Sequence, residues 1–321
     1  MTYSRIGGVI VPGFYLKNSK MLAGVFVALA LVSGLAPAQS IDDALSVDPS
    51  HNVDYPASVV ELSIESGGHR MPAHLYVAAG AGPHPTIVFL HGLPGNERNL
   101  DLAQALRRFG FNTLYFHYRG AWGAEGEYRF SQLPRDVLAV LEYLRNEKHA
   151  DRLRVDPEAL SILGHSLGGY AALASGARDE DLRCVIALSP ANLGLWQLDV
   201  KRGGGETSSR LKAYADELFM LEGFTGERLE EELAFVDAAV WDTTGFGAGL
   251  KGKALLMIVG EQDDVTPVAT MFTPVVEAYE ALGGIDITAM VISGDHSFSW
   301  SRIQLTREIL GWSDAHCRGA P

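Results

Sequence analysis

A serine between two glycines is the residue of this chain best suited to covalent chemistry. Ser166 lies in the stretch Gly164-His165-Ser166-Leu167-Gly168, between an apolar run at 159–163 and a small, apolar run at 168–177. We expect a strand, a very tight turn and a helix here, because the positions flanking the serine must tolerate almost no side chain. The free N–H groups at the start of the helix would favour developing negative charge. The pattern predicts a nucleophilic serine.

A serine hydroxyl needs a base that takes its proton and an acid that orients the base. His296 follows the last predicted strand, so it is the candidate general base. His165 would point away from the hydroxyl on such a turn, and we expect it to pack or to make a structural hydrogen bond. The carboxylates that compete for the role of the acid are Glu261, Asp263, Asp264 and Asp295. Asp295 has a second interpretation, as a neighbour that tunes or merely solvates the loop of His296.

The oxyanion of a tetrahedral intermediate needs two N–H donors. One candidate is the backbone of Leu167, next to the nucleophile. The other is the backbone of Leu93 in the stretch His91-Gly92-Leu93-Pro94-Gly95, where glycine lets the backbone approach closely. Without the turn around Ser166, this stretch would be an ordinary Gly/Pro turn.

Strand-like and helical patterns alternate from about residue 57 onward. The predicted strands are 59–64, 71–77, 86–90, 111–116, 159–163, 185–188, 254–259 and 285–292. Helical spacing of apolar residues recurs at 102–109, 137–144, 168–177 and 303–310. This alternation predicts an α/β fold with a mainly parallel twisted sheet of about eight strands and helices on both faces.

The segment at about 191–251 breaks the alternation. It contains Gly203-Gly204-Gly205 and two amphipathic helical patterns rich in acidic residues. Its place between two strands that lead toward the site predicts a helical cap or lid over the pocket. The alternative is a surface elaboration with no role at the site.

The first residues have the features of an export signal. Lys17 and Lys20 precede an apolar run at 21–35, and Ala36-Pro37-Ala38 follows it. This order predicts a signal peptide at residues 1–38, cleaved after Ala38, and a catalytic domain at 39–321. The mature protein would be periplasmic or secreted, without a stable membrane span, because the run is shorter than a bilayer requires. An uncleaved anchor is the alternative.

Composition narrows the choice of partners. The formal net charge of −13 repels phosphate backbones, so nucleic acid is not an expected partner. Two cysteines, Cys184 and Cys317, are too few for a disulfide scaffold or a Cys-rich metal site. Export would permit a bridge between them, but the apolar run that begins at Cys184 favours a small buried side chain over a bridge.

The motifs resemble those of the α/β-hydrolase superfamily, and within it the dienelactone-hydrolase and prolyl-oligopeptidase-like branches. The resemblance rests on the motifs His91-Gly92 to Gly95, Tyr118-Arg119-Gly120, Gly164 to Gly169, Gly260-x-x-Asp263 with Pro267, and Gly294-Asp295-His296. It implies that Asp263 is the acid and that no metal or organic cofactor takes part. Arg119 would bind a substrate carboxylate or, as we favour, form a structural salt bridge. Two departures limit the resemblance: we expect no propeller domain before the catalytic domain, and the expected nucleophile is serine where dienelactone hydrolase has cysteine.

These observations favour a serine hydrolase that cleaves a carboxylic ester through an acyl-enzyme, with Ser166, Asp263 and His296 as its triad. A serine peptidase or amidase would use the same residues on a short peptide or amide. A non-catalytic binding protein on the same fold is the alternative from a different class.

Overall fold

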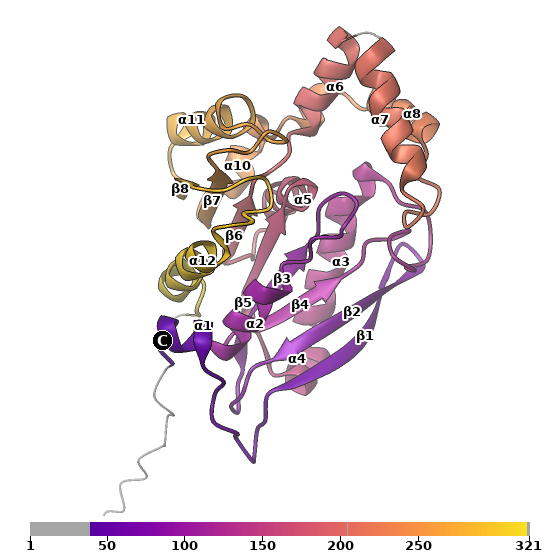
Figure 1. Cartoon of the computed structure of the whole chain (residues 1–321). Helices are drawn as coiled ribbons and strands as arrows, with labels where there is room; N and C mark the ends of the chain where they lie inside the picture. The colour runs from indigo at the N-terminus through magenta and orange to yellow at the C-terminus, as the bar shows by residue number, and fades with distance from the viewer. Residues whose placement is uncertain (1–38, 204, 320–321) are drawn as a thin grey trace, which may run out of the picture. The chain divides into compact units, whose positions relative to one another are not determined.

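The computed structural model describes residues 39–203 and 205–319, and its central element is an eight-stranded sheet in the order β1-β2-β4-β3-β5-β6-β7-β8 (Figure 1). The strands are β1 (Ser58–Ser66), β2 (His69–Val77), β3 (His84–Leu90), β4 (Asn112–Phe116), β5 (Val155–His165), β6 (Cys184–Leu188), β7 (Ala254–Gly260) and β8 (Asp286–Ile292). The pairs β1–β2 and β2–β4 are antiparallel, and the remaining pairs are parallel. The predicted mainly parallel sheet is confirmed.

Helices cover both faces of this sheet. On one face lie α1 (Ile41–Ser46), α2 (Leu100–Arg108) and α12 (Arg302–His316). On the other face lie α3 (Leu133–Arg145), α4 (Glu147–Leu153), α5 (Leu167–Gly176) and α11 (Thr273–Leu282). Every residue of β4 and β6 is buried, which explains why these strands have no alternation of apolar and polar residues. The sequence patterns did not predict α1, α4 or α11.

The insertion between β6 and β7 is helical, as expected, and more divided than the two predicted patterns. It contains α6 (Leu193–Gly203), α7 (Gly205–Glu217), α8 (Gly226–Phe235), α9 (Ala238–Trp241), the 3₁₀ turn η2 (Thr243–Phe246) and α10 (Gly247–Leu250). Two further short turns are η1 (Phe130–Gln132) and the π-helical η3 (Val268–Phe272). Helices α6, α7 and α8, here called the cap helices, project beyond the sheet, on the side where the parallel strands end (Figure 1). Helix α10 packs against α5 instead.

Backbone hydrogen bonds attach the segment between α7 and α8 to the sheet and the helices that cover it, here called the body. Trp122 donates its N–H to the carbonyl of Met220 at 2.8 Å. Glu222 donates to Gly120 at 2.6 Å and accepts from Tyr128 at 2.9 Å. These bonds give one side of the cap helices a fixed position over the strand ends.

Cys184 and Cys317 form a disulfide, so the interpretation that favoured an unbonded, buried Cys184 was wrong. Both side chains are fully buried, as that interpretation required, but they also lie together, with Cα atoms 5.6 Å apart. The reason is that the end of α12 passes the start of β6, where Arg183 Nε donates to the carbonyl of His316 at 3.0 Å. A contact between residues 133 positions apart leaves no local signal in the sequence.

The predicted signal peptide at residues 1–38 and its cleavage after Ala38 lie outside the described residues. The first described residues lead into α1, whose Ala44 is buried against α2 and α12. Within the described part of the chain, every helix is too short or too polar to cross a membrane.

Candidate active site

Ser166 occupies a strained turn between β5 and α5. Its backbone angles are φ 58° and ψ −121°, a region that residues other than glycine rarely adopt. A Cβ atom on Gly164 would lie 1.9 Å from the carbonyl oxygen of Gly168, and one on Gly168 would lie 2.0 Å from that of Leu90. Only glycine fits at these positions, as the sequence pattern predicts.

The turn is held by hydrogen bonds on both sides of the serine. Ser166 donates its N–H to the carbonyl of Leu188 at 2.9 Å. Its own carbonyl accepts from the N–H groups of Gly169 at 2.9 Å and Ala191 at 3.0 Å. A strained backbone persists only where its surroundings determine it, and the end of β6 and the segment that follows it each supply one of these contacts.

Asp263 and His296 are paired. His296 Nδ1 lies 2.8 Å from Oδ2 and 3.0 Å from Oδ1 of Asp263, which leaves Nε2 of the imidazole free of this contact. The carboxylate also accepts the N–H of Thr266 at 2.8 Å and its hydroxyl at 2.7 Å. Burial alone would raise the pKa of Asp263, but the hydrogen bonds from His296 and Thr266 outweigh it and hold that pKa well below its usual value. Asp263 is therefore ionised and positioned to orient the imidazole.

The loops that carry this pair contact each other directly. Gln262 donates its N–H to the carbonyl of Gly294 at 2.9 Å, and its side-chain Oε1 accepts the N–H of Gly294 at 3.0 Å. A Cβ atom on Gly260 would lie 2.5 Å from the carbonyl oxygen of Asp295. The glycine of the Gly260-x-x-Asp263 motif thus has a physical reason: it lets the two loops touch.

The other carboxylates that the sequence offered as the acid have other surroundings or partners. Glu261 and Asp264 are exposed. Asp295 accepts the N–H of Ser297 at 3.1 Å and both the N–H and the hydroxyl of Ser299, at 2.8 Å and 2.7 Å. Its role is to shape the turn after His296.

His165 joins the serine turn to the loop of His296. Its Nε2–H donates to the carbonyl of His296 at 2.7 Å, and the centroids of the two rings are 4.8 Å apart. The predicted structural hydrogen bond is present. Burial lowers the pKa of His165 to about 4, so its ring is neutral at pH 7. Among the hydrogen bonds of the described residues, none joins Ser166 Oγ to His296. The two residues are linked by His165, which precedes Ser166 in the chain and donates to the carbonyl of His296.

The stretch from His91 to Gly95 lies against the nucleophile. A Cβ atom on Gly92 would lie 3.0 Å from Ser166 Cβ and 3.5 Å from its Oγ. Leu93 follows immediately, and Leu167 opens α5, where the first N–H groups of a helix have no partner within the helix. The predicted N–H donors therefore belong to two segments that meet at Ser166.

Two side chains hold this stretch in shape. His91 Nδ1–H donates to the carbonyl of Gly92 at 2.8 Å, and burial lowers the pKa of His91 to about 4. Trp122 Nε1–H donates to the carbonyl of Pro94 at 2.7 Å. Sequence reasoning missed Trp122, because it lies 28 residues from Pro94 and no motif links them. It also missed Thr266, although its position three residues after Asp263 was a usable signal.

Arg119 forms a salt bridge, which is the alternative that the sequence favoured. Its Nε lies 2.6 Å from Oδ1 of Asp136, and the side chains are 11% and 1% exposed. Asp136 also accepts the hydroxyl of Ser66 at 2.7 Å and the N–H of Arg119 at 3.0 Å. A guanidinium engaged in this way fixes the end of β4 to α3 and β1.

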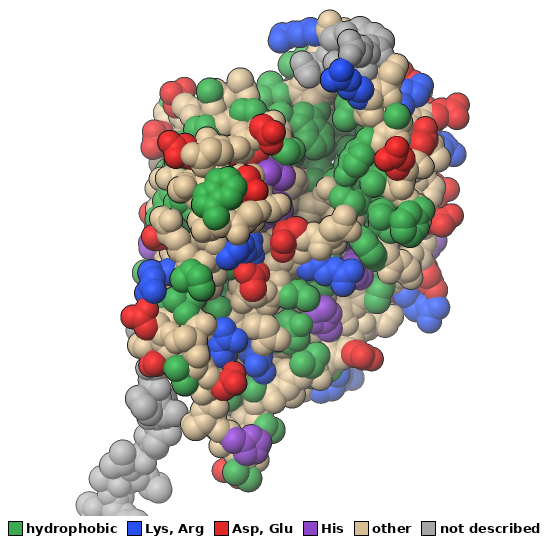
Figure 2. Space-filling model, in the orientation of Figure 1, with side chains coloured by type: hydrophobic (Ala, Val, Ile, Leu, Met, Phe, Trp, Pro, Cys, Tyr) green, Lys and Arg blue, Asp and Glu red, His purple; other side chains and the backbone are tan. Residues whose placement is uncertain are grey.

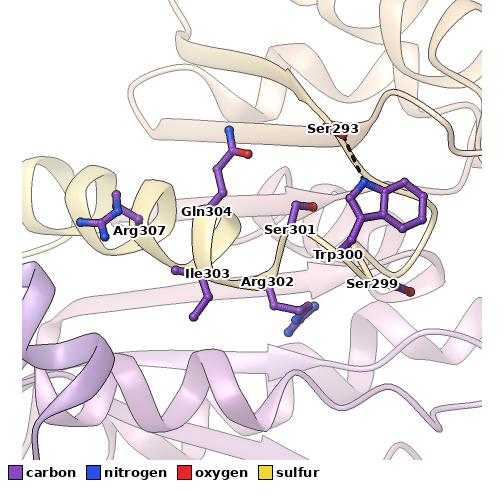
Figure 3. Close-up of a pocket in the computed structure, with 8 residues that line it drawn as sticks. All are labelled: Ser293, Ser299, Trp300, Ser301, Arg302, Ile303, Gln304 and Arg307. Carbon is purple, nitrogen blue, oxygen red and sulfur yellow. Dashed lines mark hydrogen bonds between the residues drawn. The ribbon is translucent and has the colours of Figure 1, made fainter.

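An open hollow of about 620 Å³ lies on the outer side of the loop that follows β8 (Figure 3). The indole Nε1–H of Trp300 donates a hydrogen bond to the hydroxyl oxygen of Ser293 at 3.1 Å, drawn as a dashed line in Figure 3. The described residues that line it do not include Ser166, Asp263 or His296; they are Ser293, Ser299, Trp300, Ser301, Arg302, Ile303, Gln304 and Arg307. This hollow is separate from the candidate active site. Within residues 39–203 and 205–319, no group of three or more His, Cys, Asp and Glu side chains is arranged to hold a metal ion.

Comparisons with known proteins agree with this fold. The family model described as the alpha/beta hydrolase family matches residues 87–310. The quorum-quenching protein AidA of Acinetobacter baumannii is 31% identical over 143 residues, which cover 42% of this chain and 45% of that protein. The chain thus spans less than half the length of this curated relative.

Solved structures align over more of the chain at lower identity. Est1E from Butyrivibrio proteoclasticus has a TM-score of 0.59 and 18% identity, with 79% of this chain and 98% of that chain covered. The Pyrococcus horikoshii acylaminoacyl peptidase has a TM-score of 0.59 and 15% identity, with 83% and 42% covered. Likeness at such identities shows the fold alone.

Proposed function

This chain belongs to the alpha/beta hydrolase family, and we propose that it is a serine hydrolase that cleaves a carboxylic ester through an acyl-enzyme. The observation that carries the proposal is the Asp263–His296 pair, 2.8 Å apart, beside a serine held in a strained turn. A buried, ionised carboxylate against an imidazole next to such a serine is the arrangement that activates a hydroxyl.

The proposed reaction has two halves. Ser166 Oγ attacks the ester carbonyl while His296 Nε2 takes its proton, and the N–H groups of Leu167 and Leu93 stabilise the oxyanion. His296 then gives the proton to the departing alcohol, which leaves the acyl group on Ser166. Water attacks that acyl-enzyme while His296 Nε2 takes one of its protons, and His296 then returns the proton to Ser166 Oγ as the bond to the acyl group breaks and the carboxylic acid leaves. Asp263 stays ionised throughout and stabilises the imidazolium.

Labelling with a fluorophosphonate probe tests the nucleophile. We expect wild-type protein to be labelled and Ser166→Ala to be unlabelled. The buried Ser161 and Ser189 provide control variants, because Ser161→Ala and Ser189→Ala should keep the label. Folded wild-type protein without any label would contradict the proposal and favour a binding role.

A substrate panel tests the choice of ester over amide. Short acyl esters, aminoacyl amides and dipeptidyl amides would be compared by kcat/KM with purified protein. We expect turnover of the esters. Turnover of amides alone would replace the esterase by the peptidase or amidase alternative, which uses the same residues.

We also propose that the protein is exported to the periplasm or secreted after removal of residues 1–38. The order of basic, apolar and small residues in that segment supports export. So does the disulfide between Cys184 and Cys317, since such bonds persist in oxidising compartments. N-terminal sequencing of protein recovered from the producing cells should begin at Gln39, and an intact Met1 end in a membrane fraction would contradict cleavage.

A further inference from the structure

An apolar cavity lies between the cap helices and the stretch that holds Leu93. Figure 2 shows hydrophobic side chains gathered on the walls of a hollow on this side of the molecule. The residues lining the cavity are apolar or aromatic, and come from the body (Leu93, Phe130), from α6 (Trp196), from α7 (Leu211, Tyr214, Ala215), from the turn before α8 (Phe224) and from α8 (Leu229, Leu233). Among the described residues around it, none carries a charge.

Leu93 connects this cavity to the candidate active site. Its side chain lines the cavity, while its backbone N–H is the proposed oxyanion donor. The preceding residue, Gly92, packs so closely on the nucleophile that a Cβ atom there would lie only 3.0 Å from Ser166 Cβ. A carbonyl held by the Leu93 N–H would therefore have one of its substituents within reach of the cavity.

The wall around Phe224 is closely packed. Its ring packs against Tyr128 and Phe130, with centroids 5.3 Å and 5.4 Å away. Glu222, two residues earlier, exchanges backbone hydrogen bonds with Gly120 and Tyr128. A wall fixed in this way limits the size of what enters, because packed side chains do not yield freely.

We propose that this cavity binds an uncharged, apolar chain of the ester and thereby selects its length. The proposal rests on the ester hydrolysis proposed above. Burial of each methylene should raise kcat/KM by about fourfold until the cavity is full. The space is narrow, about 20 Å³ and room for about one water molecule, so the chain that it accepts is short. A charged terminus has no partner on these walls, and its burial would be unfavourable.

Ala215 and Leu229 allow the cavity to be changed in opposite directions. Both line it and both are buried, with 1% and 5% of their surface exposed. Ala215→Phe fills the space, so kcat/KM for p-nitrophenyl propanoate and butanoate should fall by about fourfold, which is the effect of the one methylene that the cavity can hold, and that for the acetate by less than about twofold. Leu229→Ala removes carbons from the wall, and the preferred chain should become longer. The control Ala234→Phe makes the same change on the exposed face of α8 and should leave the preference unaltered.

Two ester series identify which part of the substrate enters. One series varies the acyl chain of p-nitrophenyl esters from acetate to octanoate, and the other varies the alcohol of acetate esters from ethyl to octyl. Variant effects that follow one of these lengths support the proposal and name the part that is bound. The p-nitrophenyl monoester of succinic acid should be a poor substrate for every form.

The outcomes separate this proposal from the proposed function. If wild-type protein shows neither fluorophosphonate labelling nor ester turnover, the proposed function fails. If wild-type protein hydrolyses esters but Ala215→Phe and Leu229→Ala change every ester by the same factor, the cavity has no part in selection and only this inference is overturned. Leu229→Ala keeps the test decisive should Ala215→Phe not fold.

Discussion

Two regions of the molecule are held in place by different forces. One is the set of loops that follow β5, β7 and β8, and the other is the cap helices. In the loops, directed hydrogen bonds dominate: the side chain of Asp263 is fully buried and accepts bonds from both His296 and Thr266. In the cap helices, apolar side chains face the body, and the ion pair between Lys212 and Glu230 is solvent-exposed. Exposed ion pairs of this kind add little to stability.

We infer that this difference separates the proposed catalytic site, in the loops, from the proposed selection of substrates, at the cap helices. Proton transfer requires donor and acceptor atoms at fixed short distances, which buried hydrogen bonds between loops provide. An apolar wall has only to exclude water and fit a chain, and such packing tolerates substitutions that conserve volume. We therefore expect changes in the loops to lower kcat for every substrate, and changes in the cap helices to alter the choice among substrates.

The largest effect should come from Asp263→Asn. The amide cannot hold the imidazole in the required tautomer or stabilise its protonated form, so kcat should fall by about four orders of magnitude. Steady-state kinetics with one short ester measures this. Asp264→Asn is the matched control, because Asp264 is exposed, and its kcat should stay within about twofold of wild type. Equal losses for both variants would mean that the acid is not specified by the contact with His296.

Removal of the disulfide should have the next largest effect. It should lower the stability of the body without changing the choice among substrates. Cys184→Ala combined with Cys317→Ala opens a link across 133 positions, so the free energy of unfolding should fall by about 2–4 kcal/mol. Urea unfolding measures the loss, and wild-type protein in a reductant should reproduce it. The preference among ester chain lengths should not change. An altered preference would show that the body and the cap helices are coupled more tightly than their contacts indicate.

Acid should weaken the body through its buried histidines. The pKa of His165 is lowered by burial to about 4, whereas an unfolded histidine titrates near 6.5. Between these values the unfolded chain binds a proton that the folded chain does not, so stability falls as the pH decreases through this window and levels off below it. His165→Gln removes the group, and the slope of unfolding free energy against pH should decrease there by up to about 1.4 kcal/mol per pH unit.

Urea unfolding at several pH values between 4 and 7 measures this slope for wild type and His165→Gln. The glutamine amide keeps an N–H donor for the carbonyl of His296, so the variant tests titration more than the loss of a contact. An unchanged slope would mean that the ring of His165 is not protected from protonation in the folded protein.

The sequence predicted the loops around Ser166 and Asp263 in more detail than the cap helices. Gly164, Ser166 and Gly168 lie close together in the chain, and their spacing reflects a local steric demand, so the turn was predicted in detail. Asp263 was singled out by its register in a motif, and its pairing with His296 depends on parallel strands ending at one edge of the sheet. Both signals are carried by a few neighbouring residues.

The features that sequence reasoning missed depend on contacts between distant residues. Trp122 meets Pro94, and Cys184 meets Cys317, only after the sheet has assembled. The insertion was predicted as a helical cap, yet its apolar residues are spread over several helices, and which of them line a cavity depends on how those helices pack. Helical periodicity predicts that one face of a helix is buried, but it does not predict which residues pack against that face.

The smallest effect should come from the polar contact that attaches α8 to the body. Glu232 accepts the N–H of Phe130 at 3.0 Å and the N–H and hydroxyl of Ser131 at 2.8 Å and 2.6 Å. Glu232→Gln keeps one acceptor oxygen but loses the charge, so the free energy of unfolding should fall by about 1 kcal/mol or less. Glu231→Gln changes a neighbour that forms a solvent-exposed ion pair with Arg228, and should lower the free energy of unfolding by at most a few tenths of a kcal/mol, roughly. Phe130 also lines the cavity, so a loosened α8 should broaden the range of ester chain lengths that the protein hydrolyses. A narrower range, or a loss of kcat for acetate esters, would contradict the proposed division between catalysis in the loops and selection at the cap helices.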